Sequence, residues 1–355
     1  MEGRLRLREP QITPIEGGFL VSDPYGVYEK PLALTEGGLF LLSLMEGRTL
    51  EEVQEEVFKR HGVLVPKKEL EDLAKALEEA GLLLTEKVEA RLKEEEEKLK
   101  RERPMRLAGL SYPEGEREAR AFLEAFRASY PGEGEEARVL LMPHLEPSRV
   151  PEVYGAALAA LEKTPPPERI YLVGVAHRPL KEKAAALPAL QALDALLPFE
   201  LFNTPLAFRE EHSLELPLFF LKGRFPEARV LPLLVARRSP ELGEALKVVL
   251  RDFPGLLVLA VDLSHVGPRF GDTPLTRTLA EEARRRDLGF LERLAEGEPE
   301  AALAFLGANP TRIDGVEVVA SLLPLLRERK GKVLAHRLDL EAPTLSAVGA
   351  GTLVL

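Results

Sequence analysis

The pattern of apolar and polar residues predicts a small mixed module at the start of the chain. Short apolar runs within Phe19–Tyr28 are interrupted by turn-forming Asp, Pro and Gly, which is typical of a hairpin. Three amphipathic segments follow, beginning near Thr35, Thr49 and Lys67, and Thr49 and Glu52 have the spacing of a helix capping box. Two strands followed by three short helices indicate a winged-helix-like α+β module over residues 1–84.

Residues 85–105 have a different pattern. Between Glu86 and Arg103 there are seven basic and seven acidic residues and few apolar ones. Several glutamates precede a Lys or Arg by four positions, the order that stabilises an isolated helix. Because the charges balance, this pattern favours a solvated helical linker over a charged binding tail.

From residue 106 to residue 355, apolar runs rich in β-branched residues alternate with helical stretches. The expected strands are Val139–Met142, Ile170–Val175, Val230–Val235, Leu256–Val261, Lys332–His336 and Leu345–Leu355. The expected helices include Ala119–Ala128, Val153–Leu161, Ala184–Ala195, Leu242–Val249, Leu275–Leu294 and Val316–Glu328. Such alternation predicts an α/β domain over residues 106–355, with a mostly parallel sheet sandwiched by helices.

The amino-acid composition excludes several kinds of site and several kinds of partner. None of the 355 residues is cysteine, which excludes disulfides, thiolate nucleophiles and cysteine-ligated metals. The net charge of −10 argues against non-specific binding of nucleic acid. Since no apolar run reaches the ~18 residues of a membrane span and no signal-peptide pattern is present, we expect a cytoplasmic protein without membrane contact. Abundant Lys, Arg and Glu, with neither Cys nor Trp, are typical of a thermophile.

Histidines mark the expected ends of three strands. His144 follows the strand ending at Met142, His177 follows the one ending at Val175, and His265 follows the one ending at Val261. A fourth, His212, lies at the start of a helical stretch. Ligands of parallel sheets bind beyond the carboxyl ends of the strands, so we expect these four imidazoles to share one pocket.

Each histidine taken alone is also compatible with a hydrogen-bonded core residue, and for His61 and His336 a surface or packing role is favoured. Together, the four suit a metal such as iron, copper, zinc or nickel. Asp262 could supply a carboxylate ligand or orient a histidine from behind. Neither a phosphate-binding glycine motif nor an esterase nucleophile elbow is present in the sequence.

An ordered set of motifs resembles the Memo-like family, which is protein B of the AmmeMemoRadiSam system. The matching stretches are Ala-Gly-Leu-Ser-Tyr-Pro at 108–113, Pro-His-Leu-Glu at 143–146, Val-Gly-Val-Ala-His at 173–177, Asn-Thr-Pro-Leu at 203–206, Glu-His-Ser-Leu-Glu at 211–215, Val-Asp-Leu-Ser-His-Val-Gly at 261–267 and Val-Gly-Ala-Gly at 348–351. The resemblance implies a fold similar to that of the LigB-type class III extradiol dioxygenases, with a metal or a metal-like pocket at the strand ends.

The resemblance also implies roles for individual residues. His144 and His177 match the family's metal-site histidines, and His212 matches the histidine placed like the general base of the dioxygenases. Ser264 stands at a metal-site position where animal relatives have cysteine and the dioxygenases have glutamate. Asp314-Gly315 replaces a Cys-Gly pair of many relatives. For an enzyme of this kind we expect iron or copper, held by His144 and His177 with a third ligand from Asp262, His265 or solvent. The catalytic candidates are therefore His212, His265 and Asp262, and the metal candidates are His144, His177 and Ser264.

The N-terminal module resembles PqqD-like peptide-binding domains. The similarity lies in Leu34-Thr35-Glu36, in the stretch from Gly47 to Glu52 and in the helix ending at Gly81. It implies a peptide partner that adds a strand to an exposed sheet edge. The family's system name implies radical-SAM and AMMECR-type partners. Two functions therefore stay open: a metal-dependent, dioxygenase-like oxidoreductase, or a non-catalytic protein that binds a peptide or small ligand on the same fold.

Overall fold

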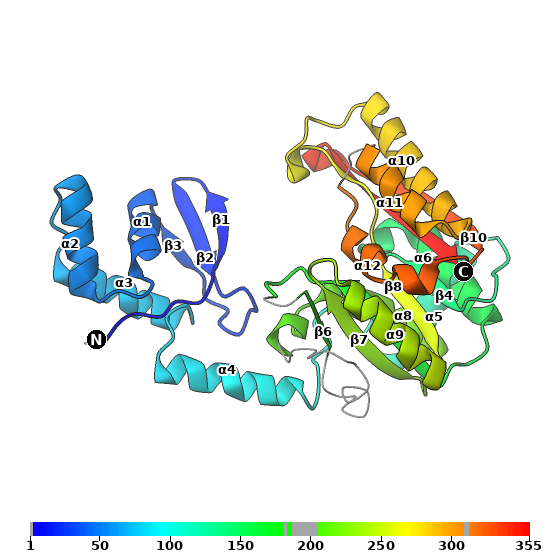
Figure 1. The fold of residues 1–355 in the computed structure, drawn as a ribbon, viewed down its shortest axis with the longest axis horizontal. Coiled ribbons are helices and arrows are strands. Elements are labelled where there is room, and N and C mark those ends of the chain that lie inside the picture. Colours follow the sequence, from blue (N-terminus) through cyan, green and yellow to red (C-terminus); the bar gives the residue numbers. More distant parts are fainter. Residues whose placement is uncertain (1–2, 181–182, 187–204, 309–311) are drawn as a thin grey trace. The chain divides into compact units, whose positions relative to one another are not determined.

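The computed structural model describes residues 3–180, 183–186, 205–308 and 312–355 (Figure 1). The chain divides into two compact units. The N-terminal unit comprises Met1–Pro104 together with Pro205–Glu210, and the C-terminal unit comprises Met105–Thr204 and Glu211–Leu355.

The N-terminal unit combines a small antiparallel sheet with helices. Its strands are β1 (Gln11–Ile15), β2 (Gly18–Ser22) and β3 (Leu32–Leu34), in the order β1-β2-β3. Its helices are α1 (Glu36–Met45), α2 (Leu50–His61), α3 (Lys67–Glu79) and α4 (Glu86–Leu99). The predicted capping box at the start of α2 is confirmed, since Thr49 and Glu52 satisfy each other's backbone amides.

The hairpin expected within Phe19–Tyr28 is wrong. Strand β2 pairs instead with β1, with Phe19 opposite Pro14. The segment that follows is a turn organised by the buried carboxylate of Asp23, which accepts the amides of Tyr25, Val27 and Tyr28. An Asp side chain that bonds nearby backbone amides competes with strand pairing, which explains why the second half of the run is not a strand.

The C-terminal unit contains a mixed sheet with a parallel centre. Its described strands are β4 (Val139–Met142), β5 (Arg169–Val175), β6 (Ala184–Ala186), β7 (Arg229–Val235), β8 (Leu256–Ala260), β9 (His265–Val266), β10 (Lys332–Glu341) and β11 (Ser346–Val354). Their order is β10-β11-β4-β8-β5-β7-β6, and β9 pairs with β11. Strands β4, β8, β5 and β7 are mutually parallel, whereas β6, β10 and β11 join in antiparallel fashion.

The segment Ala184–Ala195, expected as a helix, begins instead as a strand. Residues 184–186 form β6, paired with β7, and residues 187–204 lie outside the described part of the chain. An alanine run has a strong helical propensity, so pairing with the edge of β7 has overridden the local preference here.

Helices pack against the sheet in two groups (Figure 1). The first group is α5 (Glu116–Ala128), α6 (Pro151–Lys163) and α8 (His212–Arg224); the second is α9 (Pro240–Asp252), α10 (Arg277–Ala295), α11 (Pro299–Ala308), α12 (Val316–Ser321) and α13 (Leu323–Leu326). Val139 and Leu141 of β4 pack into the core with the second group. Leu140 and Met142, which point the opposite way along the strand, are equally buried. The α/β sandwich predicted from the sequence is thus confirmed.

Among the described residues, we find no helix that combines the length and the apolar character needed to cross a membrane.

Candidate metal centre

The candidate site is built at the carboxyl ends of three neighbouring parallel strands. Strand β8 lies between β4 and β5, and Met142 of β4 pairs with Ala260 of β8. His144 comes two residues after β4, and His177 comes two residues after β5. The sheet order alone therefore brings these two imidazoles to one edge, as expected for a ligand site of a parallel sheet.

A third imidazole comes from the first residue of α8. His212 begins this helix, and Glu211 caps it by accepting the amide of Ser213. The helix lies close to β5 because Ser213 Oγ donates to the carbonyl of Val175 at 2.7 Å. Gly174 makes this approach possible, since a Cβ atom there would lie 2.6 Å from Ser213 Oγ.

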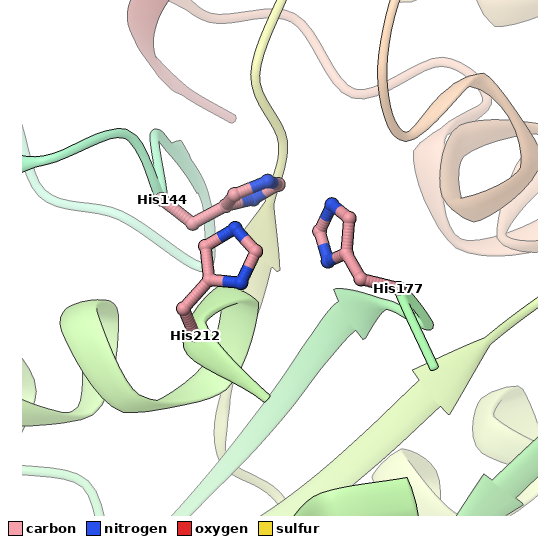
Figure 2. A group of neighbouring side chains, drawn as sticks. All are labelled: His144, His177 and His212. Atoms are coloured by element: carbon pink, nitrogen blue, oxygen red, sulfur yellow. The ribbon is translucent and has the colours of Figure 1, made fainter. Parts of the chain in front are cut away.

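The three rings converge on one point (Figure 2). One ligand atom from each of His144, His177 and His212 lies within 4.8 Å of the others. The ring centroids are 5.2 Å apart for His144 and His177, 5.4 Å for His144 and His212, and 4.3 Å for His177 and His212. His144 is buried, whereas His177 and His212 are partly open to solvent. The group thus has one protected and two accessible ligands.

Two of the imidazoles are oriented by acceptors behind them. His144 Nδ1 donates to the carbonyl of Ala260 at 3.2 Å, and His177 Nδ1 donates to Glu211 Oε1 at 2.8 Å. These contacts fix a proton on Nδ1 in both rings and direct Nε2 into the site. Glu211 is fully buried and also accepts the amide of His177 at 2.8 Å, so one carboxylate sets both the backbone and the ring of that residue.

Asp314 is the carboxylate nearest to the two oriented rings. Its Oδ2 lies 2.9 Å from His144 Nε2 and 3.2 Å from His177 Nε2. It precedes Gly315, whose left-handed backbone begins α12. From the sequence, Asp314 was recognisable only as a substitution for cysteine, and it was not among the predicted site residues. It is more than 100 residues away from each of the three site histidines along the chain, and the signal that could have identified it was that substitution.

Asp262 holds the backbone of the His144 loop. Its Oδ1 accepts the amides of His144 at 2.8 Å and Leu145 at 3.0 Å. Its Oδ2 lies 3.6 Å from His144 Nε2. Of the two roles left open by the sequence, these contacts support the orienting one.

The structure does not bring Ser264 and His265 into the group of three histidines. Ser264 Oγ is buried and donates to Asp287 at 2.5 Å. His265 lies in β9, where its Nδ1 bonds the carbonyl of Leu263 at 2.9 Å and its ring packs edge-on against Phe270. Pairing of β9 with β11 explains both positions, because it turns the chain away from the parallel strand ends soon after Asp262.

The two remaining histidines lie elsewhere. His61 packs edge-on against Phe40, with ring centroids 5.0 Å apart. The side chain of His336 is buried and bonds Asp287 at 3.0 Å. The packing role predicted for these residues agrees with these contacts.

The pKa values of the residues in this group are shifted in different directions by burial and by neighbouring charges. Burial favours the neutral form of His177, but hydrogen bonds to Asp314 and Glu211 outweigh it and raise its pKa to about 10. His144 follows the same pattern: the charges of Asp262 and Asp314 overcome burial and raise its pKa. In Asp314 and Glu211 the same contacts outweigh burial and lower the pKa, for Glu211 to about 2.

His212 differs from the other two histidines. The protein packed around its ring and the neighbouring charges of His144 and His177 lower its pKa to about 3, although part of the ring reaches solvent. Its ring is therefore neutral at pH 7. A general base works best with a pKa near the operating pH, and the pKa of His212 lies well below that.

Comparison with known proteins identifies the family of this chain. The family described as Memo-like protein matches residues 103–354. A MEMO1 family protein of Thermus thermophilus is 95% identical over 326 residues, covering 88% of this chain and all of the relative. A MEMO1 family protein of Aquifex aeolicus is 32% identical over 377 residues, covering 98% of this chain and 99% of the relative. One from Thermotoga maritima is 29% identical over 146 residues, covering 39% of this chain and 48% of the relative. The chain belongs to the Memo-like family.

Proposed function

We propose that the chain binds one first-row transition metal ion through His144, His177 and His212, with Asp314 as a fourth donor. The observation that carries this proposal is the convergence of three imidazoles whose ligand atoms lie within 4.8 Å of one another. The residues fit such an ion, because acceptors behind His144 and His177 leave Nε2 as the free ligand atom in the neutral ring. His212 is already neutral at pH 7, as a ligand must be.

The donor set favours iron(II) over copper(I). Imidazole nitrogen and carboxylate oxygen are the ligands of mononuclear non-haem iron sites, whereas copper(I) is selected by soft sulfur ligands. The sequence contains no cysteine, and Asp314 supplies oxygen where many relatives have a thiol. Copper(II), which accepts nitrogen and oxygen donors, is the second choice.

We further propose that the protein is an oxidoreductase of the dioxygenase-like kind. A bound redox-active ion would supply binding and activation of oxygen or of an aromatic substrate. The residues of this chain would hold the site in shape: Glu211 orients His177, Asp262 holds the His144 loop, and the partly open His177 and His212 leave access from solvent.

Oxygen consumption tests this activity. Protein loaded anaerobically with iron(II) should consume oxygen faster when a catechol is added, and His177→Ala should abolish the increase. Ser148→Ala, at an exposed position in the loop after His144, is the control for handling and should behave as the unmodified chain. Equal consumption by all three proteins would contradict the proposal.

A second candidate is a protein that binds a ligand on this fold without redox turnover. It is favoured by one observation: Asp314 already satisfies Nε2 of both His144 and His177, which closes a polar network without an ion. For the N-terminal unit we propose capture of a peptide by strand addition. Among the described strands β1 pairs only with β2, and Ile12 and Ile15 on it are exposed.

The proposed protein partners are of the radical-SAM and AMMECR types, and this proposal rests on the family resemblance. Co-purification of the full chain with such partners tests it. Replacing Ile12 and Ile15 by Glu should weaken capture if β1 is the recruiting edge, and should leave it unchanged if recruitment occurs elsewhere.

A further inference from the structure

A second buried polar cluster lies outside the histidine group, around Asp287 of α10. Asp287 is fully buried. Its Oδ1 accepts both the amide of Ser264 at 3.0 Å and the hydroxyl of Ser264 at 2.5 Å, and its Oδ2 bonds His336 Nε2 at 3.0 Å. A buried carboxylate is costly to desolvate, and these three hydrogen bonds offset that cost and hold the side chain in one orientation.

This cluster has the residue types of a hydrolytic triad but not its order. In such a triad the histidine lies between serine and aspartate, so that it can take the serine proton. Here the aspartate lies between Ser264 and His336, and all three side chains are buried. Nucleophilic catalysis at Ser264 is therefore excluded by the geometry.

The strand next to the cluster is shaped to admit the carboxylate. Gly349 of β11 faces Asp287, and a Cβ atom at this position would lie 2.1 Å from Asp287 Oδ2. Gly349 also exchanges backbone hydrogen bonds with the segment beyond β8. The amide of Leu263 donates to the carbonyl of Gly349, and the amide of Gly349 donates to the carbonyl of Ser264, both at 2.8 Å. Residues 262–265 are thus fixed in two ways. Backbone hydrogen bonds hold them against β11, and the hydrogen bonds of Ser264 hold them to Asp287.

The segment that contains Asp314 lies along the other edge of residues 262–265. The amide of His265 donates to the carbonyl of Arg312 at 2.7 Å, and the amide of Asp314 donates to the carbonyl of Leu263 at 3.3 Å. Ser264 and Ile313 form a β-bridge between the two segments. Displacement of residues 262–265 would therefore move Asp314, and would also move Asp262, which holds the His144 loop.

We infer that Asp287, acting through Ser264, is a positioning residue for the metal centre: it fixes residues 262–265 and thereby sets Asp262 and Asp314 against the histidines. This inference rests on the proposed metal site. It adds a supporting network of residues that do not themselves bind the metal. Ser264, expected from the family resemblance to bind metal, acts from behind the site instead. Supporting residues of this kind change metal affinity by about tenfold to a hundredfold when they are replaced.

Cobalt(II) bound to the full chain is the probe, because its visible spectrum reports ligand geometry separately from stability. Asp287→Asn should weaken cobalt(II) binding by about tenfold or more and alter the visible spectrum. Ser264→Ala should act in the same direction with a smaller loss, and adding it to Asp287→Asn should cost little more, since both act on one contact. If Asp287→Asn does not fold, Ser264→Ala alone carries the test.

Thr352→Val is the control for general destabilisation. Thr352 is buried in β11 and donates to the carbonyl of Val153, away from the cluster. It should lower the unfolding temperature but leave cobalt(II) affinity and spectrum unchanged. An unchanged affinity and spectrum in Asp287→Asn and Ser264→Ala, with the unmodified chain binding normally, would overturn the positioning role alone. Failure of the unmodified chain to bind cobalt(II) would overturn the metal site, and this inference with it.

Discussion

Asp314 Oδ2 lies 2.9 Å from Nε2 of His144, the ring nitrogen that a metal ion would need. The same oxygen is 3.2 Å from Nε2 of His177. Both histidines therefore donate to one carboxylate. The charge of Asp262 and the hydrogen bond to Asp314 raise the pKa of His144, and hydrogen bonds to Asp314 and Glu211 raise the pKa of His177. An incoming ion has to displace these protons, which links metal binding to pH.

Metal affinity should rise with pH. His177 must lose its Nε2 proton to bind, and its pKa in the metal-free chain is about 10, so protons compete with the ion throughout the neutral range. We expect the apparent affinity to increase by about tenfold per pH unit for each proton released. Calorimetry at pH 7 in buffers of different ionisation enthalpy measures the proton release directly, and metal binding without any release would contradict this account.

The stability of the metal-free chain should depend on His177 with a defined sign. A folded-state pKa of about 10 lies above the usual 6.5, so the stabilising contribution is fully present below pH 6.5 and is lost as the pH rises toward 10. The contribution of Asp314 to stability depends on pH in the opposite direction. Because its pKa is lowered in the folded state, the contribution is present above pH 3.8 and is lost as the pH falls.

Urea unfolding of chelator-treated protein at several pH values checks this. The difference in unfolding free energy between the unmodified chain and His177→Gln should shrink from pH 6 to pH 10. A difference that stays constant or grows would show that the proton on His177 does not stabilise the fold.

Gly174→Ala should disturb the site through packing. The added Cβ would lie 2.6 Å from Ser213 Oγ and 2.9 Å from Leu214 Cδ2, so α8 and its first residue, His212, must shift. Overpacking of this kind costs about 1–3 kcal/mol of stability, and we also expect weaker metal binding. Gly307→Ala is a matched control in α11, where nothing lies within 4 Å of the added atom; it should leave metal binding unchanged and should not lower stability, because alanine is favoured over glycine in a helix.

Arg209→Met should destabilise the N-terminal unit. Within that unit Arg209 bonds Glu95 at 2.8 Å and the carbonyl of Gly26 at 2.7 Å, and its side chain is only 7% exposed. Removing one partner of a buried ion pair leaves the other charge uncompensated, which costs about 3 kcal/mol. Arg4→Met breaks an exposed pair with Glu52 and should cost less than about 1 kcal/mol. Thermal unfolding of both variants compares the two losses.

The parts of the site that follow from sheet topology could be predicted from the sequence. His144 and His177 each come just after an apolar strand, and parallel pairing through β8 brings such positions to one edge. His212 was identified because it begins a helix. The capping box of α2 was predictable for a similar reason, since it depends on residues three positions apart.

The parts that depend on contacts between distant segments could not be predicted. Ser264 and His265 come within three residues of Asp262, but pairing of this segment with β11, some 80 residues later in the chain, directs Ser264 to Asp287 and His265 to Phe270. Asp314 enters the site because its segment pairs with residues 263–265. Neither event leaves a local pattern in the sequence.

Metal analysis tests the central claim most directly. Protein purified without chelator, loaded with iron(II) or copper(II) and passed through a desalting column, should retain about one ion per chain. His144→Ala and His177→Ala should each lose most of it, while His265→Ala, outside the histidine group, should retain it. Retention of far less than one ion by the unmodified chain, or equal retention by all four proteins, would contradict the metal centre described above.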